Sequence, residues 1–300
     1  MRFHLFNSLG VSIMNNKKQK VIPYKLGPYN EWEEFQVFSR LSNDVYSYFN
    51  EIFSAKSKEL KRPMHHMFYR FKYLAESSSH SFRLISSWTF GLPALALLRV
   101  RLEQLIVCSY LIYEDVSQGL SNYLKHTAIN KYYQIKTSFQ DGIIKDRLET
   151  KFDLLKMANG ARLAQIEIDP EYNMASDKFQ RKWTKLNLRS MAIRRDSLAA
   201  TKFRAHSLER EYLTFYNVLS SLTHSDCSTI SHEYLGEYAA EGKIVLMTKP
   251  EWIIIGLACM AHYDILQCHE ILNFFNIDVE EHFGILMGQW QKERDRCLIR

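Results

Sequence analysis

The chain has 300 residues, of which 46% are apolar and 13% aromatic, enough to bury a large core in one or two domains. Its 11 glycines and 6 prolines are few for an all-β protein with many turns, so the composition argues against that class. The net charge of +6 is modest and gives only slight support to an anionic partner.

The cysteine and hydropathy patterns exclude further classes of protein. The 5 cysteines are scattered and include no Cys-x-x-Cys pair, so they predict neither a disulfide framework nor a thiolate zinc site. No run reaches the roughly 18–20 apolar residues that a membrane-spanning helix needs. We therefore expect a cytoplasmic protein with reduced thiols and no membrane contact, and we predict neither a metal site nor a cofactor.

The N-terminal segment differs in composition from the rest of the chain. Residues 1–28 are basic and end in Gly27-Pro28, which predicts a flexible arm before a single domain over residues 29–300. Met14, followed by two asparagines and two lysines, is a second candidate start, so the sequence leaves open whether Met1 or Met14 is the first residue.

From residue 31 onward, apolar residues recur by threes and fours, the pattern of amphipathic helices. We expect the first helix to begin there and to extend past Ile52. Further helices are expected over 63–76, 81–115 with a break at Gly91-Leu92-Pro93, 118–140, 142–165 and 205–224, with a basic segment over 176–204.

The last third of the chain carries signals for both a hairpin and helices. Glycines separate short apolar pieces and predict a small β-hairpin at 232–248. Thr248-Lys249-Pro250-Glu251 is a helix start, with Thr as N-cap and Glu in the capping-box position, and the helix should reach residue 275 before a final helix from Val279. The fold class is therefore all-α, a single helical bundle of about eight to ten helices.

A polar face on the predicted helix over 205–224 is the first candidate site. Tyr212, Tyr216, Ser220 and His224 follow one another at intervals of four residues and so share one helical face, with Asp226 just beyond. An imidazole that titrates near neutrality is suited to acid–base catalysis. The same histidine is also compatible with a buried structural role at the end of a helix, and the sequence leaves both readings open.

Arg99 and Glu103 form the second candidate. They lie one turn apart in the most apolar predicted helix, whereas Arg101 lies on the other side of it. One interpretation is a site wall in which Arg99 holds an anion or phosphate and Glu103 orients the guanidinium. The other is an internal salt bridge that fixes helix packing.

The basic segment over 176–204 is the third candidate. Its cations surround a tryptophan, and such a pattern can bind a phosphate backbone while the aromatic ring stacks on a base. The residues that would contact nucleic acid are Arg181, Lys182, Trp183, Lys185 and Arg189. A solvated basic helix face explains the same composition, since no nucleic-acid-binding motif of known spacing accompanies it.

Motifs from all three candidates together resemble those of a known bacterial family. The helix containing Arg99-x-x-x-Glu103, the Trp183 and Leu188-Arg189-x-Met191-Ala192 segments, and the Tyr212-to-His224 pattern together resemble domain-of-unknown-function family 5677. That family is similar in outline to the all-α HEPN domains, many of which are metal-independent RNases of toxin–antitoxin and phage-defence systems. The resemblance implies RNA as partner, a homodimer, and a protein partner encoded nearby.

The chain also departs from the HEPN pattern. In HEPN nucleases an Arg is followed by four to six residues and then by His, whereas this chain has Ser220 near that place before His224. Arg99 would have to supply the cation from another helix. We therefore expect a bacterial defence or stress protein that binds or cleaves RNA, with His224, Arg99, Glu103 and Ser220 as catalytic candidates. One alternative is a non-catalytic helical scaffold or sensor that acts through protein partners, and another is a small-molecule or nucleotide pocket lined by Arg99 and Tyr216.

Overall fold

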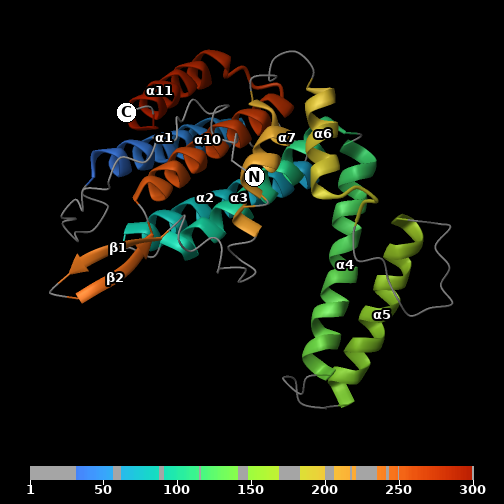
Figure 1. The fold of residues 1–300 in the computed structure, drawn as a ribbon. Helices are drawn as coiled ribbons and strands as arrows, with labels where there is room; N and C mark the ends of the chain where they lie inside the picture. Colours follow the sequence, from blue (N-terminus) through green and yellow to red (C-terminus); the bar gives the residue numbers. More distant parts are fainter. Residues whose placement is uncertain are drawn as a thin grey trace. The chain divides into compact units, whose positions relative to one another are not determined.

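The computed structural model of the chain describes residues 32–56, 62–87, 91–114, 116–140, 148–168, 183–199, 206–216, 218–220, 235–240, 243–248 and 250–298 (Figure 1). These residues include 9 α-helices, so the all-α prediction is confirmed and the helix number falls in the expected range. The predicted N-terminal arm, residues 1–28, lies outside the described residues. Among the described helices, none is long and apolar enough to cross a membrane.

Contacts divide the described residues into two compact units, and each is described by itself. The first unit comprises the described residues up to Ser109 together with those after residue 200. The second unit lies between Tyr110 and Ala199. The single domain expected over 29–300 stays a prediction.

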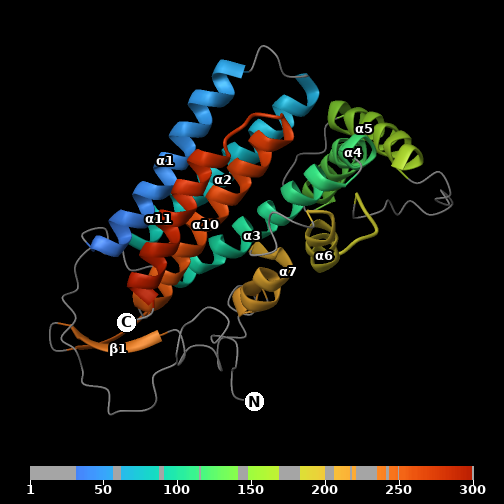
Figure 2. The same ribbon diagram turned by 90° about the horizontal axis from the view of Figure 1, so that it is seen from above.

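The first unit is a helical bundle built around α10 (Pro250–Phe274). Its other long helices are α1 (Glu33–Lys56), α2 (Arg62–Ser87) and α11 (Glu280–Leu298), together with α3 (Gly91–Tyr113) as far as Ser109. Helix α10 packs against α1, α2 and α11, and Figure 2 shows it among these helices. Every residue from Met260 to Leu272 is buried, including polar side chains such as Asp264 and Gln267.

Helix α1 confirms the predicted apolar stripe. Phe35, Phe38, Leu41, Val45 and Phe49 are all buried, and they recur at the three- and four-residue spacing that places them on one side of a helix. The aromatic residues of this stripe supply much of the apolar surface removed from water when α1 packs on α10.

Helix α2 is longer than the sequence predicts. The sequence predicts that this helix ends near Glu76. Instead, it continues through the run of polar residues that follows from Ser77 and ends at Ser87. The reason is that this run is not solvated throughout: Ser79 and Phe82 are fully buried. The Ser79 hydroxyl donates a hydrogen bond to Asp264 of α10, 2.8 Å away, and this bond satisfies its polar group inside the bundle.

A short helical segment and a hairpin precede α10. Helix α7 (Leu208–Glu211) starts at Ser207, whose hydroxyl accepts from the amide of Arg210, and it continues as the π-helix η4 (Tyr212–Tyr216). The predicted hairpin is confirmed, because β1 (Leu235–Ala240) pairs antiparallel with β2 (Lys243–Thr248).

The second unit contains α4 (Val116–Gln140), which packs against α5 (Leu148–Ile168), and α6 (Leu188–Leu198). The buried core between α4 and α5 consists of Ile129, Tyr132, Ala161 and Ala164. Helix α6 begins after Asn187, whose side chain accepts from the amide of Ser190.

The close contact between α10 and α2 yields a prediction. A Cβ atom at Gly256 would lie 2.5 Å from Cζ of the buried Phe82, so the two helices approach too closely for a side chain. We expect Gly256→Ala to destabilise the protein by about 1–3 kcal/mol through overpacking, measured by urea unfolding. The control is Gly284→Ala on α11, where a Cβ meets nothing within 4 Å, and its unfolding free energy should not fall. Equal effects of the two changes would contradict the close contact.

Candidate functional site

Arg99 and Glu103 of α3 come together with Tyr216 of η4. Nε of Arg99 lies 3.1 Å from Oε1 of Glu103, and its Nη2 donates to the Tyr216 hydroxyl at 3.2 Å. Glu103 and Tyr216 therefore contact the Arg99 guanidinium from two sides. The Arg99 and Glu103 side chains are 19% and 37% exposed, so these three residues are accessible to solvent.

Aromatic stacking extends this cluster along η4. The guanidinium carbon of Arg99 lies 5.0 Å from the centre of the Tyr216 ring, and the Tyr212 ring stacks on Tyr216 with centroids 4.5 Å apart. Both tyrosines are partly exposed. The arrangement thus combines a fixed cation with an aromatic surface, and we call Arg99, Glu103, Tyr212 and Tyr216 the Arg99 cluster.

The protonation states of the Arg99 cluster follow from its contacts. Burial acts to lower the pKa of Arg99, but the hydrogen bond to Tyr216 and the electrostatic interactions with Tyr216 and Glu103 outweigh this effect and raise the pKa. Burial raises the pKa of Tyr216, and Glu103 adds to that shift while Arg99 opposes it. The cluster therefore carries a permanent cation beside a neutral phenol at physiological pH.

Three contacts hold the segment that bears these tyrosines on the first unit. At its start, Nδ1 of His206 lies 3.0 Å from Nε2 of His262. One residue before η4, the buried carboxyl group of Glu211 accepts a 3.0 Å hydrogen bond from the Tyr263 hydroxyl. The Arg99–Tyr216 contact is the third, so α10 and α3 both position η4.

Of the four residues predicted to share a face, the structure brings Tyr212 and Tyr216 together with Arg99 and Glu103. Ser220 lies four residues beyond Tyr216 and is half-buried. His224 and Asp226 lie outside the described residues. Their roles, like that of Ser220, stay predictions.

The candidate nucleic-acid contacts lie in the second unit. Lys185 and Arg189 are exposed, whereas Arg181 and Lys182 lie outside the described residues. Trp183 is half-buried, with its ring 5.8 Å from that of Tyr110 and 5.3 Å from that of Tyr123. These ring contacts give Trp183 a packing role within its own unit.

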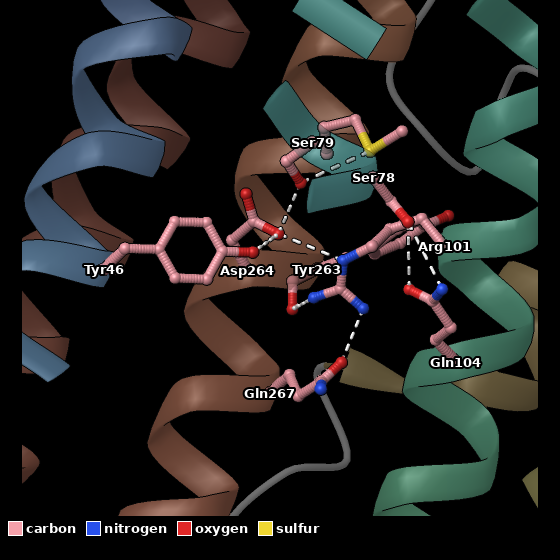
Figure 3. Close-up of polar contacts among 9 residues, drawn as sticks. Tyr46, Ser78, Ser79, Arg101, Gln104, Tyr263, Asp264 and Gln267 are labelled. Carbon is pink, nitrogen blue, oxygen red and sulfur yellow. Dashed lines mark hydrogen bonds and ion pairs between the residues drawn. The ribbon is translucent and has the colours of Figure 1, made fainter. Parts of the chain in front are cut away.

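A second polar cluster, which the sequence reading missed, lies in the core of the bundle (Figure 3). Oδ1 of Asp264 accepts hydrogen bonds from the hydroxyls of Tyr46 at 2.6 Å and Ser79 at 2.8 Å, and it lies 3.1 Å from Nε of Arg101. Arg101 also donates to Oε1 of Gln267 at 2.5 Å and to the carbonyl of Tyr263 at 2.8 Å.

Burial determines what this network can do. The side chains of Arg101 and Asp264 are both 0% exposed, so neither can contact a ligand in solution. Burial acts to lower the pKa of Arg101, but its electrostatic interactions with Tyr46 and Asp264 and its hydrogen bond to Asp264 leave the pKa raised, so the guanidinium stays ionised. A buried charge pair with several hydrogen bonds fixes the position of α3 against α10 and does not perform chemistry on a substrate.

The sequence contains a signal for this network, which is the presence of Arg101 and Asp264 in the two strongly apolar helices α3 and α10. The side of α3 that bears Arg101 and the side of α10 that bears Asp264 are both fully buried. A charge at such a position must be paired inside the protein. From the sequence, Arg99 and Glu103 are either a site wall or an internal salt bridge, whereas the structure leaves these two partly accessible and buries Arg101.

The described residues contain no group of three or more His, Cys, Asp or Glu side chains that could hold a metal ion. Of the cysteines, Cys108 and Cys268 are buried free thiols, and burial raises the pKa of both. A raised pKa keeps the thiols protonated and therefore poorly nucleophilic.

The core ion pair predicts a non-additive effect of mutation. Asp264→Ala leaves the Arg101 guanidinium buried without a counter-charge, so we expect it to lower the unfolding free energy by about 3–5 kcal/mol. Arg101→Met should cost a similar amount, and the double variant Arg101→Met/Asp264→Leu should lose much less than the sum, as measured by urea unfolding. Gln104→Met is the control: it removes only the partly exposed bond to Ser78 and should cost about 1 kcal/mol. Additive single effects would contradict the coupling.

Glu211 predicts a pH dependence of stability. Burial raises its pKa above the ordinary 4.5, against the opposing effects of Tyr263, Arg210 and Arg294. The folded state therefore binds the Glu211 proton more tightly than the unfolded state does. The stabilisation that this proton provides is complete below pH 4.5 and is lost as the pH rises through the folded-state pKa. The wild-type unfolding free energy should therefore fall over this window relative to that of Glu211→Gln.

The measurement is urea unfolding of both proteins at several pH values between about 4.5 and 7.5. Glu209→Gln, two residues away and only half-buried, serves as the control and should follow the wild-type profile. Parallel curves for the wild type and Glu211→Gln would show that the buried carboxyl group does not retain its proton.

Comparison with known proteins adds one finding. The model of one family, described as "Family of unknown function (DUF5677)", matches residues 64–243. No curated protein and no solved structure matches the chain. The matched range includes the Arg99 cluster and Arg101, whereas Asp264 lies outside it.

Proposed function

The chain belongs to this family of unknown function, and from the Arg99 cluster we propose that it binds RNA through a phosphate at Arg99 and a base at Tyr212. The observation that carries the proposal is the accessible guanidinium held beside two stacked tyrosine rings. Arginine recognises phosphate by charge and by paired N–H donors, and aromatic side chains stack on bases of any sequence.

The geometry supports this proposal in a second way. Arg99 is oriented before any ligand arrives, because Glu103 and Tyr216 fix its guanidinium from two directions. A side chain that is already ordered loses less conformational entropy when it binds. A π-helix at the same place also supports a functional role, since such single turns occur frequently at functional sites.

The proposal includes cleavage of the bound RNA. The resemblance to HEPN-type RNases, noted from the sequence, favours a metal-independent reaction in which His224 moves a proton and Arg99 stabilises the phosphate. Ser220 and Asp226 would assist His224, and Glu103 would act by orienting Arg99. The same resemblance favours a bacterial defence or stress role in the cytoplasm.

A further set of RNA contacts is proposed for the second unit. Lys185 and Arg189 are exposed cations near the start of α6, and with Arg181 and Lys182 they would bind backbone phosphates. Trp183 is not needed for base stacking in this proposal, because Tyr110 and Tyr123 pack against it.

RNA binding is tested by fluorescence anisotropy with a labelled single-stranded RNA and folded full-length protein. Arg99→Met should weaken binding by about ten-fold or more, the loss expected for a charged hydrogen bond. Arg70→Met, which removes an exposed arginine of α2, is the matched control and should bind nearly as the wild type does. Binding should also weaken steeply with added salt. Salt-independent binding, or equal effects of the two substitutions, would contradict the proposal.

Cleavage is tested separately by incubating wild type and His224→Ala with total bacterial RNA in the absence of metal and identifying the fragment ends. The wild type should cleave, and the variant should bind RNA without cleaving it. Binding without cleavage by either protein would retain the RNA site and remove the enzyme.

The second candidate function is a non-catalytic scaffold that acts through a protein partner. The observation that favours it is the Arg101–Asp264 network, whose two charged side chains are fully buried and so hold helices together rather than contact a ligand. A wild type that binds no RNA even at low salt would favour the scaffold over the RNA-binding protein.

A further inference from the structure

Helix α11 carries an exposed line of residues that its packing in the bundle does not use. Glu281, Ile285, Gly288 and Lys292 are spaced by four, three and four residues, so they lie along one face, which we call the α11 outer face. All four are exposed, and Ile285 is 54% exposed. The bundle instead contacts the opposite side of the helix, where Phe283, Leu286 and Trp290 are buried.

Among the described residues, no neighbour packs closely enough against Gly288 to require a glycine there. A Cβ atom at this position would meet nothing within 4 Å. Glycine in the interior of a helix is nevertheless unfavourable for stability. A bare stretch of helix beside an exposed isoleucine provides both the space and the side chain for close packing against a second helix.

The charges on this face indicate which helix would pack against it. Glu281 lies at one end and Lys292 at the other, and Ile285 and Gly288 lie symmetrically between them. When two copies of this face meet antiparallel about a two-fold axis, each Ile285 packs over Gly288 of the second copy. Each Glu281 then faces Lys292 of the second copy. The ion pairs among the described residues involve neither Glu281 nor Lys292, so both charges are available for this contact.

We propose that the α11 outer face is a self-complementary dimer interface whose occupant is the same face of a second copy of this chain. A two-fold contact of this kind uses one patch twice, and the Glu281–Lys292 pairs select the antiparallel orientation because the parallel one opposes like charges. The proposal stands independently of the RNA site, since α11 carries none of the residues of the Arg99 cluster.

The test is sedimentation equilibrium of the full-length protein at low salt up to about 50 µM, a concentration sufficient for a micromolar dimer. We expect the wild type to dimerise and Glu281→Lys to raise the dimer dissociation constant about ten-fold or more, because it opposes two lysines at each end. The double reversal Glu281→Lys/Lys292→Glu should restore the dissociation constant to within about three-fold of the wild-type value. Glu251→Lys, an exposed reversal on α10, is the control and should leave the dimer unchanged.

Gly288→Leu provides a second readout that separates folding from association. The open space at Gly288 accommodates the new side chain, and leucine has the higher helix propensity, so the monomer should unfold at the same or a higher temperature. Its dimer should be lost, because leucine occupies the place of the second copy's Ile285. A wild type that stays monomeric, a dimer that survives both Glu281→Lys and Gly288→Leu, or a double reversal that fails to restore association would overturn the proposal.

Discussion

The buried contact between Arg101 and Asp264 constrains the bundle more than any other described interaction. Two opposite charges with no exposure are tolerated only when each is paired and hydrogen-bonded, so α3, α10, α1 and α2 must adopt one relative placement for Arg101, Asp264, Tyr46 and Ser79 to meet. Apolar packing alone tolerates small sliding between helices, whereas a charge pair with several fixed partners does not. The network therefore specifies one relative placement of these helices, although burying its charges costs desolvation free energy.

The Arg99 cluster depends on that arrangement. Arg99 lies two residues before Arg101 on α3, so the network that fixes α3 also fixes the direction in which Arg99 projects. The tyrosines reach it because Tyr263, next to Asp264 on α10, holds Glu211 at the base of η4. The accessible cluster and the buried network are thus connected through neighbouring residues of the same two helices, which gives a binding site a rigid support.

The fold was more accessible to sequence reasoning than the site was. Apolar periodicity identified α1 and the span of α10, and turn residues identified the hairpin, because these signals are local. The extension of α2 was missed because a run of serines reads as solvated unless the buried partner of Ser79 is known. For the same reason Arg101 was placed outside the site: a charge on a strongly apolar helix can be assigned to a partner only after a distant carboxylate, that of Asp264, is located in space.

The π-helix has a consequence for the length of this segment. A π-turn contains one residue more than the α-helical turn it replaces, and each residue removed or added rotates the following chain by about 100°. Deleting one residue within Tyr212–Tyr216 would therefore leave a regular helix and turn Ser220 to a different side. The length of this segment, and not only its composition, thus determines the side on which Ser220 lies, whereas the exposed side chain of Leu213 has no part in this.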